Sequence, residues 1–360
     1  MKGAENHNKC NISIIICNMA MMTLKIIKIV LLHLQKKASM KKSLTLFCLL
    51  AILFTACHRD EVPCDDYRQA MRDFVIRISE TARTEKAGFI VIPQNGIELV
   101  TLGDDADAEL APSYLAAIDG HGQEDLFYGY SSDDQPTPAR TTEYLLSYLR
   151  RSHQTGKTIL VTDYCTHPEY VADAQSRCDA EGFLSFVAPK RELNIIPTSA
   201  PPHENTQDIF QLSEAQNFLY LINNENFNSK EDFIENISAT NYDLILMDLF
   251  FNDGTAFTAA EVERLKIKAN GGKRLVICYL SIGEAEDYRY YWQASWKRHK
   301  PAWLARENPS WPGNYKVHYW YPEWQELICG EGDSYLNRIL AAGFDGVYLD
   351  IVDAFEYFEE

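Results

Sequence analysis

The chain has 360 residues, of which 46% are hydrophobic and 24% are charged, with a formal net charge of −17 at pH 7. Without a leader segment, this length is within the range of a single α/β barrel. The acidic balance argues against nucleic acid as a partner, but it would attract a cationic polymer.

The first 57 residues have the pattern of a targeting segment. Met40-Lys-Lys-Ser43 is a positively charged start, Leu44–Phe54 is apolar, and Thr55-Ala56-Cys57 supplies a small-residue cleavage site. A cysteine at that point indicates a lipoprotein signal peptide over residues 40–57, with Cys57 lipidated. We therefore expect residues 1–39 to be an over-extended amino terminus. We expect the protein to be lipid-anchored to the cell envelope, at the outer membrane or cell surface, and extracytoplasmic.

A membrane-spanning helix over residues 11–34 is the alternative, because this stretch is apolar and long enough, although Lys25 and Lys28 interrupt it. After residue 57 the chain keeps 26 basic and 50 acidic side chains, a net charge of about −24. Such a charge suits a soluble domain outside the inner membrane.

Short apolar runs bounded by Gly, Pro, Asn or Asp recur along the remaining chain and predict eight strands. Several runs have Val and Ile at consecutive positions, as in parallel strands that are buried on both faces. The predicted strands are Gly88–Pro93, Leu126–Tyr130, Thr158–Tyr164, Phe183–Ala188, Phe218–Ile222, Tyr242–Phe251, Arg274–Ser281 and Phe344–Ile351.

Helical patterns fall between many of these strands. Residues 66–82 place apolar side chains on one helical face, Thr141–His153 has a similar pattern, and Thr258–Asn270 stops at Gly271-Gly272. Eight strands with interleaved helices predict an α/β fold of the (β/α)8 TIM-barrel class. A doubly wound sheet is the alternative, but no Gly-rich phosphate loop follows any strand.

Residues 288–324 hold all six tryptophans and many tyrosines, and four prolines make residues 300–322 mostly non-helical. This segment follows the predicted strand Arg274–Ser281, so we expect an aromatic-rich loop on the carboxyl-terminal face of the barrel. Aromatic rings pack on the apolar faces of sugars. They also form satellite cores inside long loops, and both interpretations stay open.

Acidic or amide side chains end most of the predicted strands, where α/β barrels place their active sites. An acid at a strand end is often only a helix cap or ion-pair partner, but several at one face indicate an acidic cleft. Glycoside hydrolysis needs two carboxyl groups, one as proton donor and one as nucleophile or base, and crowding separates their pKa values.

Other chemistries have little support in the sequence. The histidines show no HxH or HExxH spacing, and the five cysteines after Cys57 form no CxxC pair, so zinc is not indicated. There is no GxSxG elbow and no lysine at a strand end. A divalent cation held by acids alone stays open, and we predict no cofactor.

Three segments, Tyr242-Asp-Leu-Ile-Leu-Met-Asp248, Val276-Ile-Cys-Tyr-Leu-Ser-Ile-Gly-Glu-Ala-Glu-Asp-Tyr-Arg289 and Gly343-Phe-Asp-Gly-Val-Tyr-Leu-Asp-Ile-Val-Asp353, resemble glycoside hydrolase family 114. Members of this TIM-barrel family are described as endo-α-1,4-polygalactosaminidases, and some were once labelled cysteinyl-tRNA-synthetase-like. Further similar segments are Phe89–Gly96, Ile118–Phe127, Leu160–Cys165 and Asn308–Lys316. The resemblance covers nearly all of residues 65–360 and implies one TIM-barrel glycoside hydrolase domain there.

The order of these segments departs from the family pattern. The part like Tyr242–Phe358 usually comes before the part like Asp73–Ala188, and here it comes after. We therefore expect a circularly permuted barrel. This requires the region of residue 65 and the region of residue 358 to be neighbours, as two halves of one cut connection.

The resemblance implies a catalytic pair. Asp350 matches the acid of the family's Asp-Gly-Val/Ile-x-x-Asp pattern and is expected to act as nucleophile or base. Glu124 matches a strand-end glutamate and is expected to act as acid, although it could instead precede the predicted strand Leu126–Tyr130. The expected substrate-binding residues are Asn95, Asp163, Asp248, Tyr279, Glu284, Trp292, Trp311, Trp320 and Asp353.

The sequence thus predicts an extracytoplasmic glycoside hydrolase that cleaves an amino-sugar polysaccharide, with membrane contact only through the lipid anchor. A non-catalytic glycan-binding lipoprotein on the same barrel is the alternative, because a fold alone does not prove activity. A sugar-phosphate lyase or isomerase would need a phosphate-binding loop that the sequence lacks.

Overall fold

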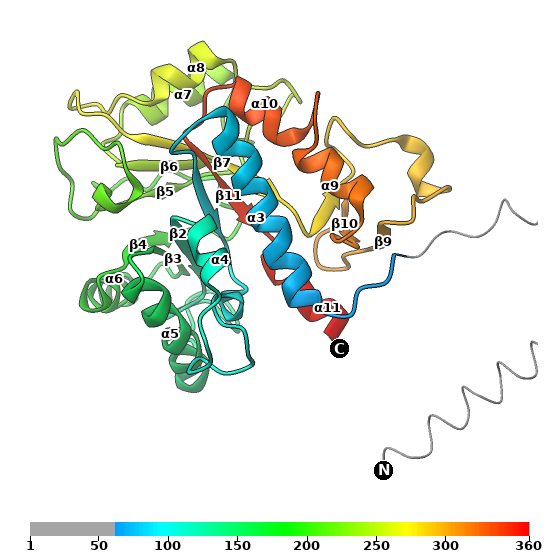
Figure 1. Cartoon of the computed structure of the whole chain (residues 1–360). Helices are drawn as coiled ribbons and strands as arrows, with labels where there is room; N and C mark the ends of the chain where they lie inside the picture. The colour runs from blue at the N-terminus through cyan, green and yellow to red at the C-terminus, as the bar shows by residue number, and fades with distance from the viewer. Residues whose placement is uncertain (1–61, 360) are drawn as a thin grey trace, which may run out of the picture. The chain divides into compact units, whose positions relative to one another are not determined.

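The computed structural model describes residues 62–359, and parallel strands form the centre of this region (Figure 1). One sheet has the order β1 (Ile90–Pro93), β11 (Gly346–Asp350), β7 (Leu275–Ser281), β6 (Leu244–Met247) and β5 (Leu219–Tyr220). The other has the order β2 (Gly120–Glu124), β3 (Thr158–Tyr164) and β4 (Leu184–Ala188). A parallel bridge between Gln94 and Gly122 joins the two sheets. The predicted parallel α/β fold is confirmed at this level.

The strand interiors are buried on both faces, as their consecutive apolar residues predict. Every residue of β1, β6 and β7 is buried. The carboxyl ends of all these strands lie on one side, because every pairing within the two sheets is parallel.

The second strand is not where the apolar pattern put it. The predicted strand Leu126–Tyr130 is wrong, because those residues form a loop that is buried except for Tyr130, and β2 is Gly120-His-Gly-Gln-Glu124. Glycine is needed in β2, since a Cβ atom at Gly122 would lie 2.0 Å from the Tyr348 hydroxyl in the interior. Glu124 therefore ends its strand, which resolves the ambiguity in its position.

Helices connect the strands and cover their outer faces. They are α3 (Tyr67–Glu85), α4 (Pro112–Ala117), α5 (Ala139–Gln154), α6 (Pro168–Glu181), α7 (Lys230–Ser238), α8 (Ala259–Leu265), α9 (Pro322–Cys329), α10 (Tyr335–Ala341) and α11 (Glu356–Glu359), with 3-10 turns η1 (Ile97–Val100), η2 (Leu212–Glu214), η3 (Ala294–Lys297) and η4 (Val352–Phe355). The predicted helix over 66–82 is confirmed, with the Asp66 side chain accepting from the Gln69 amide as its cap. The predicted helix Thr258–Asn270 is too long, because Ile267 leaves the helix to pair with Lys273.

Helix α3, the first helix of the described region, packs against β1. It contacts α10, α9 and α4, and Figure 1 shows it (blue) crossing strand β11 (red). The two ends of the described region meet beside it: Arg68 pairs with Glu359 at 3.0 Å, and the Tyr67 and Phe358 rings lie 5.4 Å apart. These contacts satisfy the neighbour requirement of the permutation hypothesis.

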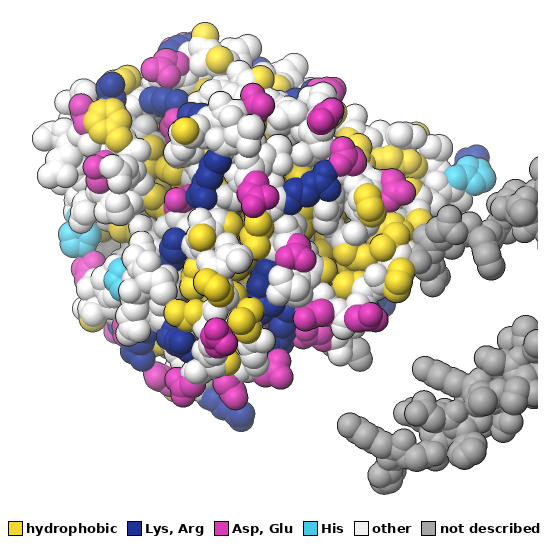
Figure 2. All heavy atoms as spheres, in the orientation of Figure 1, with side chains coloured by type: hydrophobic (Ala, Val, Ile, Leu, Met, Phe, Trp, Pro, Cys, Tyr) yellow, Lys and Arg dark blue, Asp and Glu magenta, His cyan; other side chains and the backbone are white. Residues whose placement is uncertain are grey.

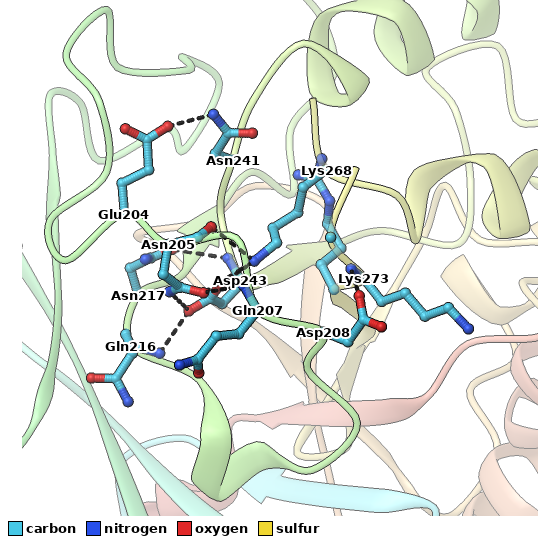
Figure 3. A network of polar contacts seen from close by, with 12 residues as sticks. Glu204, Asn205, Gln207, Asp208, Gln216, Asn217, Asn241, Asp243, Lys268 and Lys273 are labelled. Carbon is cyan, nitrogen blue, oxygen red and sulfur yellow. Dashed lines mark hydrogen bonds and ion pairs between the residues drawn. The ribbon is translucent and has the colours of Figure 1, made fainter. Parts of the chain in front are cut away.

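The β4–β5 connection, residues 189–218, is unlike the others because it contains only η2. No ladder joins β4 to β5 among the described residues, but the Phe186 and Phe218 rings lie 5.6 Å apart and Asn223 N–H donates to the Leu193 carbonyl. A buried polar cluster fixes this segment to the amino-terminal end of β6 (Figure 3). In it, Asp243 accepts from Lys268 Nζ and from the side chain of Asn205, each at 2.9 Å.

The aromatic segment after β7 has its own antiparallel sheet, in the order β8 (Glu284–Glu286), β10 (Asn314–Val317) and β9 (Leu304–Glu307). It is therefore more ordered than the loop we expected. Trp296, Trp303 and Trp324 are buried, and the rings of Trp296 and Trp324 both pack against Trp303, which makes the three a satellite core. Trp311 is exposed and is free to pack on a sugar. The satellite-core interpretation therefore applies to the buried tryptophans, and the sugar-packing interpretation applies to Trp311.

None of the helices within residues 62–359 is long and apolar enough to cross a membrane. The face drawn in Figure 2 mixes acidic, basic and apolar side chains without a large area of one charge. The predicted amino-terminal segments, residues 1–39 and 40–57 with Cys57, lie outside the described residues, as does the alternative helix over 11–34. The five cysteines from Cys64 onward are free thiols.

Candidate active site

A cavity of about 710 Å³ opens among the carboxyl ends of the parallel strands and the aromatic segment. Its lining comes from both sheets and from β8, so residues far apart in sequence converge on it. Among the predicted site residues, the cavity lining includes Asn95, Glu124, Asp248, Tyr279, Glu284, Trp311, Asp350 and Asp353.

Glu124 ends β2 at the floor of this cavity and accepts hydrogen bonds on both carboxyl oxygens. The Tyr164 hydroxyl donates to Oε1, while Gln94 Nε2 donates to Oε2 at 2.5 Å and Asn95 Nδ2 donates to Oε2 at 3.3 Å. Burial and the charge of Asp350 raise the pKa of Glu124 to about 7. At neutral pH this carboxyl group is therefore protonated in a large fraction of molecules.

Asp350 ends β11 and has a separate hydrogen-bond partner. The Tyr279 hydroxyl donates to its Oδ2 at 2.5 Å. Burial raises the pKa of Asp350 to about 6, while the bonds from Tyr279 and from the Ile351 amide oppose the shift. Of the two acids, Asp350 is thus the one that ionises first.

Three adjacent strands end with the same backbone geometry. The polar residue at the end of each strand is followed by a residue with a positive φ angle. These following residues are Asn95 (+57°) after Gln94, Asp125 (+56°) after Glu124 and Ile351 (+58°) after Asp350. The left-handed region is unfavourable for residues with a side chain, most of all for β-branched isoleucine. The chain therefore turns sharply after each polar residue of the cavity floor.

A buried ion-pair group forms another part of the wall. Arg289 pairs with Asp248 at 2.7 Å and with Glu286 at 2.5 Å, and all three side chains are nearly inaccessible. The Tyr288 hydroxyl donates to Glu286 at the cavity side. Two carboxylates around one guanidinium leave a net negative charge here.

Glu284 and Asp353 add further negative charge to the lining. Asn308 Nδ2 donates to Glu284 Oε1 at 2.8 Å, and burial raises the pKa of Glu284. Burial, with the charge of Asp350 as the next cause, raises the pKa of Asp353 well above its usual value. The cavity lining is thus rich in carboxyl groups, and burial raises the pKa of several of them.

Three predicted substrate-binding residues lie outside the cavity lining. Asp163 precedes the cavity-facing Tyr164 and so points to the other face of β3, where its Oδ1 accepts from the amides of Phe127 and Tyr128. Trp292 packs on Tyr315, with ring centroids 4.8 Å apart. Trp320 donates from Nε1 to the Val62 carbonyl and packs on Phe358.

The site residues predicted from the sequence did not include Gln94, Glu286 or Arg289. Gln94 ends the predicted strand Gly88–Pro93, and Glu286 and Arg289 follow the next-to-last strand, so strand-end position was the available signal. Within residues 62–359, no group of three or more His, Cys, Asp or Glu side chains is arranged to hold a metal ion.

The fold and the site define an α/β protein with paired carboxyl groups at the carboxyl ends of parallel strands, the arrangement that glycosidases use. Residues 199–360 match the model of glycoside-hydrolase family GH114. This part of the chain is thus similar to glycoside hydrolase family 114. Asp248, Glu284 and Asp350 lie inside the matched range, and Glu124 lies before it.

Uncharacterized proteins from three organisms are similar to parts of the chain. The protein from Methanocaldococcus jannaschii is 43% identical over 160 residues, which is 44% of this chain and 42% of that protein. The one from Thermotoga maritima is 40% identical over 144 residues, 40% and 41% of the two chains. The one from Deinococcus radiodurans is 47% identical over 115 residues, which is 32% of this chain and 34% of that protein. The matches thus span less than half the length of these relatives.

Proposed function

We propose that the protein hydrolyses glycosidic bonds of a polysaccharide, with Glu124 as proton donor and Asp350 as nucleophile or base. The observation that carries this proposal is two carboxyl groups with raised pKa values and separate hydrogen-bond partners on one cavity floor. Glu124 would protonate the leaving glycosidic oxygen. Asp350 would attack the anomeric carbon or deprotonate the attacking water.

The substrate class we propose is an amino-sugar polymer, as in the endo-α-1,4-polygalactosaminidases that the family resemblance implies. The acidic lining supports it, because Asp248, Glu284 and Glu286 would attract protonated amino groups. The net charge of about −24 after residue 57 would steer such a polymer toward the protein. Activity on a cationic polymer should then fall as ionic strength rises.

We also propose that the eight parallel strands constitute one (β/α)8 barrel over residues 65–360, in circularly permuted order. The supporting observations are the order of neighbouring strands within the two parallel sheets, the parallel bridge that joins the sheets, and the packing of α3 against β1. The lipoprotein pattern ending at Cys57 supports a lipid-anchored, extracytoplasmic location.

The proposed function is tested by reducing-end release from an α-1,4-linked polymer of galactosamine and N-acetylgalactosamine. The wild type should release ends, whereas Asp350→Asn should release none and still bind the polymer. Asp107→Asn, at an exposed site outside the cavity lining, is the matched control and should behave as wild type. Binding without release by the folded wild type would instead favour a glycan-binding lipoprotein.

A further inference from the structure

Gln94 spans the interior between the two sheets and connects Glu124 to a tyrosine on a distant strand. Its Nε2 donates to Glu124 Oε2 at 2.5 Å, and its Oε1 accepts from the Tyr220 hydroxyl at 2.8 Å. Tyr220 ends β5, whereas Glu124 ends β2. Gln94 and Tyr220 are almost completely buried, so no bulk water competes for these bonds.

The Tyr220 hydroxyl determines which way the Gln94 amide faces. A neutral phenol has one proton to donate, and here it is donated to the amide oxygen. Burial raises the pKa of Tyr220 well above its usual value, so the phenol keeps that proton at any physiological pH. The amide nitrogen, which can only donate, is therefore held against Glu124.

The backbone on both sides of this contact is also fixed. Gln94 N–H donates to the Leu349 carbonyl at 2.8 Å, and Asn95 N–H donates to the Gly122 carbonyl at 2.9 Å. The Asn95 side-chain oxygen accepts from the Glu124 amide at 3.1 Å. Neither Gln94 nor Glu124 can move away without breaking bonds that join β1 to its neighbours.

We propose that Tyr220 and Gln94 are positioning residues that hold one face of the Glu124 carboxyl group, so that its acidic proton is kept on the cavity side. With Tyr220 in place, the Gln94 amide cannot turn its oxygen toward Glu124 and accept that proton. The proton then occupies a position from which it can reach a bound glycosidic oxygen. This inference rests on the proposed role of Glu124 as acid.

Other groups act on the same carboxyl group and must stay constant in any test. Tyr164 donates to it, and the charge of Asp350 faces it from β11. The titratable and charged groups around Glu124 are His121, Asp125, Tyr164, Arg191, Tyr220, Tyr348, Asp350 and Asp353.

The test is the pKa of Glu124 in Tyr220→Phe, measured without substrate by carboxyl-carbon NMR titration of the folded protein and assigned with Glu124→Gln. The substitution keeps the ring that packs edge-on against Tyr348 and removes only the hydroxyl. The freed amide can then accept a proton from Glu124, which stabilises the protonated form. We expect the pKa to rise by roughly 0.5 to 1 unit, the effect of about one hydrogen bond.

The matched control is Tyr114→Phe, which removes a buried hydroxyl that has no hydrogen-bond partner in the described region and lies outside the cavity lining. It should leave the pKa of Glu124 unchanged. An unchanged pKa in Tyr220→Phe as well, with a native chemical-shift pattern, would overturn the proposal. If Tyr220→Phe fails to fold, Gln94→Met supplies the same comparison, and it too should raise the pKa by removing the donor.

Turnover gives a second measurement. In Tyr220→Phe, kcat should fall by about 3- to 10-fold with KM little changed, and the alkaline limit of the pH profile should move upward with the pKa. An inactive wild type would contradict the proposed function but not the positioning role, because the NMR measurement needs no substrate. A changed KM with an unchanged pH profile would contradict the positioning role alone.

Discussion

At the scale of residues, the cavity floor is built with backbone strain. Asn95, Asp125 and Ile351 all hold left-handed φ angles directly after Gln94, Glu124 and Asp350. Each such residue costs on the order of 1 kcal/mol or more, and such strain persists only where the surroundings enforce it. Because this strain recurs on three adjacent strands, we infer that the backbone of the cavity floor favours the placement of its side chains at the expense of stability.

The two carboxyl groups should give a bell-shaped pH dependence of kcat/KM. Asp350 must be ionised, so activity should fall as the pH drops below about 6. Glu124 must be protonated, so activity should fall as the pH rises above about 7. Initial rates measured across this range check the prediction, and a rate that stays constant well above the upper limit would exclude Glu124 as the acid.

At the scale of elements, the strands that could be predicted from the sequence are those whose residues are apolar in succession and buried on both faces. Strands β3, β7 and β11 were predicted to within about two residues at either end, because both faces are buried and their residues are apolar in succession. Strand β2 was missed because Gly120 and Gly122 leave no apolar signal. Glycine is needed at these two positions because a Cβ atom at Gly120 would clash with Leu212 and one at Gly122 would clash with Tyr348. Both of these neighbours are distant in the sequence.

The candidate site was predictable to the same degree. Glu124 and Asp350 came from strand ends and from the family resemblance, and the structure brings both to one cavity. The bond from Tyr220 to Gln94 joins residues 126 positions apart, so no local pattern encodes it. Asp163 was misplaced because a strand-end position does not say which face of the strand a side chain takes.

The connection between β4 and β5 depends on one buried ion pair. Lys268 and Asp243 are both fully inaccessible and lie 2.9 Å apart, and the Gln216 amide also donates to Asp243 (Figure 3). Replacing Lys268 with Met leaves a buried carboxylate without its cation, which should lower the free energy of unfolding by about 3 to 5 kcal/mol.

Chemical denaturation of Lys268→Met measures this loss. Lys273→Met is the control, because Lys273 is exposed on the same segment and its side chain should contribute little. Equal stability of the two variants would show that the cluster does not hold the connection in place.

At the scale of the whole molecule, we expect that the helices and strands can be connected in a different order along the chain while each keeps its neighbours in space. Arg68 and Glu359 form an ion pair, and residues 198–200 are exposed in the helix-poor connection between β4 and β5. A chain that starts at Ala200, joins Glu359 to Val62 through a short Gly/Ser linker and ends at Ser199 should therefore fold. Its thermal midpoint should lie within a few degrees of that of the original order.

Circular dichroism and thermal unfolding check this prediction. The control is the same linker closure with a cut inside β7, which should abolish folding because that strand is buried along its whole length. Loss of folding in the chain cut at Ser199 would contradict the permuted-barrel proposal.

The central claim is that Glu124 and Asp350 divide the work of hydrolysis, and an activated aryl glycoside of galactosamine tests it most directly. A dinitrophenyl leaving group needs no proton, so Glu124→Gln should keep turnover of this substrate within about tenfold of wild type while losing about 10²-fold or more on the polymer. Asp350→Asn should lose turnover of both. Retained aryl-glycoside turnover in Asp350→Asn, or equal losses on both substrates in Glu124→Gln, would contradict the account.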